Sequence, residues 1–168
     1  MEAFWRGWPE AHGIGLNISP RLVRHGKARH PKVAYCAIDA LRMAIADGMV
    51  EAIVSVEAVL HLPSRGTFLD EAWRVLRPRG RLVLTDILGA DPRLFGDWLL
   101  AAAALADLEA YIALCATHGF RVEQLQDVTR ETWGGFCDYL AGLPATADLA
   151  AALRNGIGTY VFAELVKS

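Results

Sequence analysis

The sequence predicts one α/β domain with a mainly parallel sheet that is covered by helices on both faces. Short apolar segments rich in β-branched residues alternate with segments whose apolar residues recur at helical spacing. Apolar residues make up 54% of the 168 residues, compared with ~45–50% in a typical soluble domain. The chain therefore has the length of one domain and enough apolar surface for a large core.

The N-terminal half contains three predicted strands and one predicted helix. Residues 13–18 form a short extended segment, and Ser19 with Pro20 then opens a helix, because serine is a good N-cap and proline is tolerated at the first helical position. Residues 33–38 and 52–56 are short apolar runs typical of buried strands. The run at 52–56, AIVSV, is the most strand-like segment of the chain.

The C-terminal half continues the alternation. Ser64 can cap a helix whose apolar stripe includes Trp73, which we expect in the core. Gly119 is placed to stop a long helical region. The remaining predicted elements are a turn at 78–80, a strand at 81–88, a helical region at 95–118, a strand at 121–128, a helix at 129–140 and a final strand at 159–166.

Charge and cysteine content exclude several classes of protein. The net charge is −2, with 17 basic and 19 acidic residues, so no nucleic-acid partner is expected. Cys36, Cys115 and Cys137 are widely spaced, which predicts free thiols in a reducing compartment. No group of His, Cys or carboxylate residues has the spacing of metal ligands, so no metal site is predicted.

No export signal or membrane span is expected. The N-terminus carries charged residues and lacks the apolar stretch of a signal peptide. The nearest candidate for a span, residues 98–116, holds Asp107 and Glu109 at its centre, where charge in lipid is costly. The sequence therefore predicts a cytoplasmic protein without a membrane partner.

Four blocks and a closing strand resemble a known family. The blocks are GLNIS (15–19), CAIDA (36–40), AIVSVEAVLHL (52–62) and FLDEAWRVLRPRGRLVLTD (68–86), and the closing strand is TYVFAELVKS (159–168). In this order and spacing they resemble the class I S-adenosylmethionine (SAM) dependent methyltransferases, in particular the small-molecule group that methylates sugar and natural-product hydroxyls. The resemblance implies a Rossmann-like methyltransferase sheet flanked by helices, SAM as cofactor and a small-molecule substrate.

The front of the chain departs from that family. The family places a strand and a G-x-G-x-G loop before the segment that GLNIS resembles, whereas residues 2–10 resemble the helix after that loop. We therefore expect an N-terminally truncated methyltransferase sheet. Its unpaired strand edges could pair directly, be covered in a homo-oligomer, or be completed by further N-terminal sequence. The alternative function is a non-catalytic module or fragment that acts through protein–protein association.

The resemblance assigns cofactor contacts to residues that follow the first strands. Asn17, with Ile18 beside it, would accept hydrogen bonds from the ribose hydroxyls; the alternative is a turn-forming asparagine. Asp39, with Ala40 beside it, would accept from the adenine amino group; the alternative is an N-cap for a helix over 41–46.

Three further residues follow later strands and would act near the transferred methyl group. By resemblance, Glu57 lines the methionine part of SAM, and the alternative is a surface glutamate. His61 would remove the acceptor's proton, because an imidazole with a pKa near ~6.5 suits that task at neutral pH. Asp86 would orient the His61 ring. The alternatives are a structural hydrogen bond for His61 and a loop cap for Asp86.

The family also carries a substrate-covering insertion. By resemblance, residues of about 90–108 and 130–157 would form it, with Trp98 and Trp133 as possible walls of an apolar pocket. Plain packing is the alternative for each tryptophan.

Overall fold

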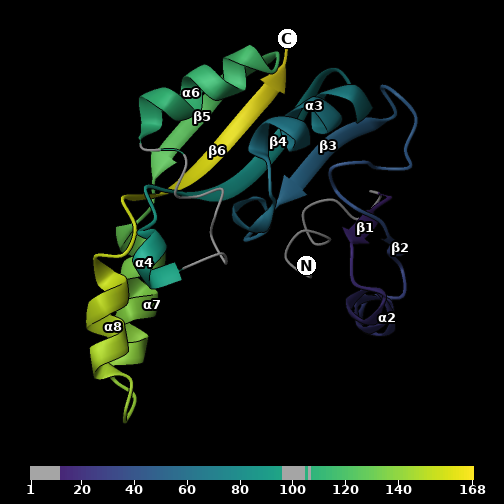
Figure 1. Cartoon of the computed structure of the whole chain (residues 1–168). Helices are drawn as coiled ribbons and strands as arrows, with labels where there is room; N and C mark the ends of the chain where they lie inside the picture. Colours follow the sequence, from purple (N-terminus) through teal and green to yellow (C-terminus); the bar gives the residue numbers. More distant parts are fainter. Residues whose placement is uncertain (1–11, 96–104, 106) are drawn as a thin grey trace. The chain divides into compact units, whose positions relative to one another are not determined.

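The computed structural model describes residues 12–95, 105 and 107–168, and the chain divides into two compact units, Met1–Ala44 and Ile45–Ser168 (Figure 1). Whether the whole chain forms the single domain predicted from the sequence stays a prediction.

The first unit is a strand–helix–strand motif. Strands β1 (Ile14–Asn17) and β2 (Ala34–Ala37) pair in parallel, and helix α2 (Pro20–Arg29) connects them. The hydroxyl of Ser19 accepts a hydrogen bond from the Leu22 N–H at 3.4 Å, which confirms the predicted N-cap and helix start.

The second unit is built on a mixed four-stranded sheet. Its strands are β3 (Val50–Ser55), β4 (Leu76–Leu88), β5 (Phe120–Asp127) and β6 (Thr159–Lys167), in the order β3-β4-β6-β5. β3 and β4 are parallel, whereas β6 is antiparallel to both β4 and β5. Three strands thus share one direction and their C-terminal ends share one edge, as predicted, while the final strand makes this sheet mixed.

The core of the second unit lies between the sheet and helices α3 (Arg65–Val75) and α6 (Leu108–Thr117). The hydroxyl of Ser64 accepts from the Thr67 N–H at 3.1 Å and caps α3 as predicted. The α3 stripe is buried through Phe68, Leu69 and Ala72. The opposite face of the sheet carries half-buried side chains, among them Thr85 and Phe162.

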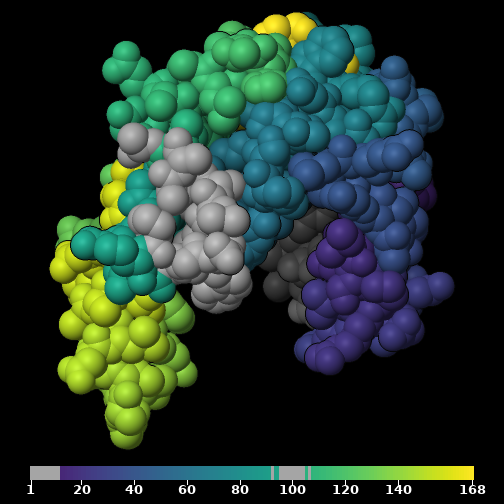
Figure 2. All heavy atoms as spheres, in the orientation of Figure 1, coloured from purple at the N-terminus to yellow at the C-terminus, as the bar shows by residue number. Residues whose placement is uncertain are grey.

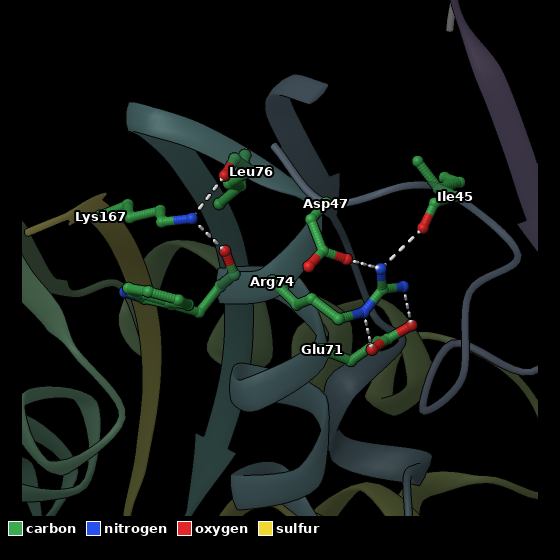
Figure 3. Close-up of polar contacts among 7 residues, drawn as sticks. Ile45, Asp47, Glu71, Arg74, Leu76 and Lys167 are labelled. Carbon is green, nitrogen blue, oxygen red and sulfur yellow. Dashed lines mark hydrogen bonds and ion pairs between the residues drawn. The ribbon is translucent and has the colours of Figure 1, made fainter. Parts of the chain in front are cut away.

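Trp73 does not lie in the core where the sequence predicted it, because it is 40% exposed. The Lys167 ammonium lies 3.8 Å from the centre of its ring. The same ammonium donates hydrogen bonds of 2.7 Å to the carbonyls of Trp73 and Leu76 (Figure 3). A buried charge needs such partners. Trp73 therefore lies at the surface, over the buried ammonium of Lys167, instead of filling the interior.

The predicted turn at 78–80 lies within β4 as an irregularity. The pairing of β3 with β4 jumps from Val50 with Leu76 to Ala52 with Arg81, and Arg79 has a φ of 62°. Arg74, just before this point, donates to the Glu71 carboxylate and to the Ile45 carbonyl at 2.8 Å (Figure 3). The irregular segment of β4 thus follows the C-terminal end of α3, which the hydrogen bonds of Arg74 hold in place.

The remaining elements agree with the sequence in outline. Asp107 caps α6, and Gly119 follows that helix with a φ of 79°. The middle of the predicted helical region, with Trp98, lies outside the described residues. The other elements are η1 (Val59–His61), α4 (Pro92–Phe95), η3 (Arg130–Gly134), α7 (Gly135–Ala141) and α8 (Ala147–Arg154).

Helices α7 and α8 lie side by side and extend away from the end of the sheet (Figures 1 and 2). They fall within the segment 130–157 that the sequence assigned to a substrate-covering insertion, an assignment that stays a prediction. None of the helices in the described part of the chain is long and apolar enough to cross a membrane. Association through exposed strands such as β3, whose Val54 is 54% exposed, also stays a prediction.

Candidate functional site

The four predicted contact residues of the first unit lie at one end of its two strands. Asn17 ends β1 and Ile18 follows it, while Asp39 and Ala40 follow β2, which pairs with β1 in parallel. The Ile38 N–H donates to the Asn17 carbonyl at 3.1 Å. The fold of this unit therefore brings the two predicted pairs together at neighbouring strand ends.

The side chains of these residues also hold their own turns. The Asn17 Oδ1 accepts from the Ser19 N–H at 2.8 Å, and the Asp39 Oδ1 accepts from the Leu41 N–H at 2.9 Å. Asn17 therefore makes the hydrogen bond expected of a turn-forming asparagine, which was the alternative to the ribose contact. Asp39 begins a turn closed by a hydrogen bond from the Arg42 N–H, and not the helix over 41–46. Both residues are exposed, so their remaining acceptor capacity faces solvent.

In the second unit, Glu57 stands at the C-terminal edge of the sheet, just beyond β3. Its φ of 55° is a left-handed conformation that glutamate seldom adopts. Its N–H donates to the Thr85 hydroxyl at 3.1 Å, and its carboxylate accepts from the Tyr160 hydroxyl. The loop after β3 is therefore tied to both β4 and β6.

His61 lies close enough to Glu57 for their charges to interact. It ends η1, where Val59 and Leu60 are each 2% exposed and anchor the loop in the core. Partial burial of the carboxylate raises the pKa of Glu57, and the charge of His61 lowers that pKa to a smaller extent. The structure therefore brings together an acidic and a basic group, both exposed to solvent, at the end of β3.

Asp86 is placed differently from its predicted role. It is 0% exposed, and both of its carboxylate oxygens accept from Arg65, at 2.7 and 2.8 Å. The Ile87 N–H donates to one of those oxygens at 2.8 Å. Because side chains alternate along a strand, Asp86 faces α3, while its neighbour Thr85 faces the side of Glu57. The structure thus gives Asp86 a buried structural partner in place of the predicted contact with His61.

Asp86 lies in a buried part of the second unit, close enough to Cys115 and Tyr111 for its charge to act on them. Burial raises the pKa of Cys115 to about 12, and the negative charge of Asp86 adds to that rise. The same two causes, in the same order, raise the pKa of Tyr111. Both groups stay protonated near neutral pH. On this face of the sheet, which α3 and α6 cover, the ion pair of Asp86 with Arg65 is buried among them.

Thr85 and Tyr160 are site residues that the sequence analysis missed. Tyr160 is 3% exposed, and it was interpreted only as part of a closing strand. Its place could be found only from the pairing of β4 with β6, which sets Ile87 opposite Tyr160. The ring packs with Leu60 and Ile87 in an apolar cluster below the site.

An open hollow lies beside this cluster, past the end of β5. Trp133 forms one wall, and its indole N–H donates to the Leu153 carbonyl at 2.8 Å. Arg130 and Arg154 bring positive charge to the rim, while Asp127 and Glu131 bring negative charge. Within the described ranges, no cluster of His, Cys, Asp and Glu residues could hold a metal ion.

Comparison with known proteins identifies a consistent set of relatives. A family model described as a methyltransferase domain matches residues 2–84. Methyltransferase GfsG of Streptomyces halstedii is 31% identical over 132 residues, which cover 70% of this chain and 48% of that protein. The 27-O-demethylrifamycin SV methyltransferase of Amycolatopsis mediterranei is 28% identical over 146 residues, covering 77% and 54%. The chain spans about half the length of these curated relatives.

Solved structures share the fold at low identity. Geranyl diphosphate C-methyltransferase from Streptomyces coelicolor, solved with S-adenosyl-L-homocysteine, matches with a TM-score of 0.78 and 18% identity, over 100% of this chain and 66% of that one. The [4+2]-cyclase SpnF matches with a TM-score of 0.66 and 19% identity, over 98% and 69%. One fold thus carries different chemistries, so function must be argued from the site.

Proposed function

We propose, from the premise that this chain belongs to the class I SAM-dependent methyltransferases, that the protein transfers a methyl group from SAM to a small-molecule acceptor. The observation that carries this proposal is the methyltransferase-domain match over residues 2–84. That segment contains the ends of β1 and β2 in the first unit and the end of β3 in the second unit. The name of one relative, a 27-O-demethylrifamycin SV methyltransferase, supports a hydroxyl as the acceptor group.

The residues of the first unit fit the adenosine part of SAM chemically. Asp39 and Asn17 offer oxygen acceptors at neighbouring strand ends, and adenine and ribose present N–H and O–H donors to such acceptors. Each side chain uses one oxygen in a local turn, which fixes its direction. Ile18 is 73% exposed and, with Ala40, would add apolar contact to the rings.

Glu57 fits the methionine part of SAM. A carboxylate at the end of β3 can accept from an ammonium group, and a charge-assisted hydrogen bond of this kind is stronger than a neutral one. His61, which lies beside it, would hold a proton that leaves the acceptor. SAM supplies the electrophilic methyl group.

In the proposed reaction, an oxygen–methyl bond forms as the sulfur–methyl bond breaks, and the hydroxyl proton passes to His61. Removing that proton as the bond forms is general base catalysis, which typically contributes about 10²–10⁴-fold. Asp86 does not take part directly, because Arg65 occupies its carboxylate. Its role in the proposal is to hold α3 and β4 together below the site.

The hollow past β5 is a candidate for the acceptor site. Trp133 offers an aromatic wall, and the charged rim can orient polar groups of a bound molecule. Most of its lining residues, including Trp133 and Arg154, belong to the segment 130–157 that the family resemblance assigns to substrate covering. If the acceptor binds in this hollow, the aromatic wall and the charged rim favour a partly apolar molecule with polar substituents.

The first test is calorimetric titration of the 168-residue chain with SAM and with S-adenosylhomocysteine. Micromolar binding of both would support the proposal for this chain. Absence of binding at millimolar ligand would contradict the proposal for this chain and would favour the alternative, a non-catalytic module that acts through association.

His61→Ala tests the proposed base. We expect turnover with a hydroxyl acceptor to fall by about 10²–10⁴-fold while the affinity for SAM stays within about twofold. His25→Ala, which changes a histidine of α2, serves as the matched control and should keep its turnover. Equal turnover in His61→Ala and the wild type would remove His61 from the mechanism.

A further inference from the structure

Glu57 is held in a conformation that its own backbone does not favour. Its φ of 55° brings the Cβ of an L-residue close to the backbone, so the surrounding contacts must stabilise it. Those contacts come from two neighbouring strands, through Thr85 of β4 and Tyr160 of β6. The strain and the contacts that oppose it therefore meet at one residue of the candidate site.

The three residues form a closed ring of hydrogen bonds. The Glu57 N–H donates to the Thr85 hydroxyl oxygen at 3.1 Å, and the Tyr160 hydroxyl donates to the Glu57 carboxylate. The Tyr160 and Thr85 oxygens lie 3.4 Å apart. Since a phenol has one hydrogen and a hydroxyl can rotate, the Thr85 hydroxyl is free to donate to Tyr160 while Tyr160 donates to Glu57.

The position of Tyr160 is itself fixed by the core. The side chain is 3% exposed and packs with Leu60 and Ile87. Its backbone N–H donates to the Thr129 hydroxyl at 2.7 Å, and its carbonyl accepts from the Val128 N–H at 2.8 Å. The Tyr160 hydroxyl is therefore attached to a residue that the core holds in place, whereas Glu57 lies on an exposed loop.

We propose that Tyr160 is a positioning residue that holds the Glu57 carboxylate in place for the ligand at the end of β3, with Thr85 completing the hold. The ligand role of Glu57 rests on the proposed function. The hydrogen bond from Tyr160 to the Glu57 carboxylate can be tested without a ligand. Tyr160 does not touch the reacting atoms in this proposal. It acts through the direction that it gives to Glu57.

The ligand-free test follows the Glu57 carboxylate by carbon NMR as the pH is varied, with Glu57→Gln used to assign its signal. A hydroxyl that donates to a carboxylate favours the charged form. In Tyr160→Phe we therefore expect the pKa of Glu57 to move further upward. Tyr111→Phe is the matched control, because Tyr111 is also buried, at 2% exposed, and faces the Asp86 side of the sheet. This control should leave the pKa of Glu57 unchanged.

The second test measures SAM affinity in the same variants. We expect Tyr160→Phe to weaken SAM binding by about ten- to hundredfold, the effect of one hydrogen bond to a charged group. The same change in a Glu57→Gln background should cost much less, because its effect passes through the carboxylate. Thermal unfolding checks that each variant is folded.

The outcomes separate the two proposals. If the wild type does not bind SAM, the proposed function fails, and the NMR titration alone decides whether Tyr160 holds Glu57. If the wild type binds SAM and Tyr160→Phe binds equally well with an unchanged Glu57 pKa, Tyr160 is only a packing residue and the inference is overturned. An upward pKa shift together with weaker binding supports it.

Discussion

At the scale of single residues, the most informative position is Glu57. A non-glycine residue in a sparsely populated backbone region costs on the order of 1–3 kcal/mol and persists only where its surroundings enforce it. Here the Thr85 and Tyr160 hydroxyls supply that enforcement. Strain of this kind gathers at functional sites, which agrees with the place of Glu57 at the C-terminal edge of the sheet.

Glu57→Gln tests the electrostatic state of this residue. Burial raises the folded-state pKa of Glu57 above its ordinary value, so its stabilising contribution is present below the ordinary pKa and is lost as the pH rises through the folded-state pKa. Glutamine carries no charge at any pH. We therefore expect the variant to gain stability relative to the wild type between pH 4 and pH 8.

Urea denaturation at both pH values measures this gain. Glu123→Gln on β5, an exposed residue, is the control and should show a smaller dependence. A stability difference between Glu57→Gln and the wild type that is the same at both pH values would contradict the raised pKa.

At the scale of elements, the junction of α3 and β4 depends on one buried ion pair. Arg65 is 6% exposed and Asp86 0% exposed, and Arg65 also donates to the Ile87 carbonyl at 2.8 Å. Removing one partner of such a pair leaves an uncompensated charge in a low-dielectric interior. The ion pair therefore fixes the position of α3 against β4, the strand that also carries Thr85.

Arg65→Met should lower the free energy of unfolding by about 3–5 kcal/mol. Combining it with Asp86→Leu should recover most of that loss, because the pair is then replaced by apolar groups. Chemical denaturation of both variants measures the difference. Arg93→Met, which removes an exposed ion pair with Asp91, is the control and should have little effect. A mild effect of Arg65→Met would show that water reaches Asp86.

At the scale of the whole molecule, the described core belongs almost entirely to the second unit. Val33 and Met43 are the only described buried apolar residues that precede residue 45. All four strands of the second unit's sheet, and the three pairings among them, lie within Ile45–Ser168. This unit therefore has the internal contacts of an independently folding domain.

A fragment of residues 45–168 should fold without the first unit. We expect a well-dispersed amide NMR spectrum in which most β4 and β6 signals match those of the full chain, and cooperative unfolding in urea. Collapsed, poorly dispersed signals would show that the first unit is required. The Arg65→Met variant of the same fragment provides a destabilised reference.

The sequence by itself determined most of the helices and strands, but not all of their boundaries. The strand β4 begins at Leu76 and not at residue 81, and the helix predicted over 41–46 is a turn. Ser19 and Ser64 predicted helix starts correctly, since capping depends on a side chain and the backbone three residues later. The predicted strands lie where short apolar runs occur, and Gly119 follows α6 with a positive φ. These features are local, so they can be derived from neighbouring residues alone. The sequence also placed Asn17 at the end of a strand and Asp39 just after one, whereas the parallel pairing of β1 with β2 brings the two residues to neighbouring strand ends.

Only the tertiary structure decided which side chains meet. Asp86 was expected beside His61, yet strand alternation turns it towards Arg65, and the charge of His61 acts on Glu57 instead. Tyr160 reaches Glu57 across more than a hundred residues of sequence, because the antiparallel pairing of β6 with β4 brings its start to the C-terminal edge of the sheet. Contacts of this kind depend on strand order and register, and no local pattern in a single sequence encodes them.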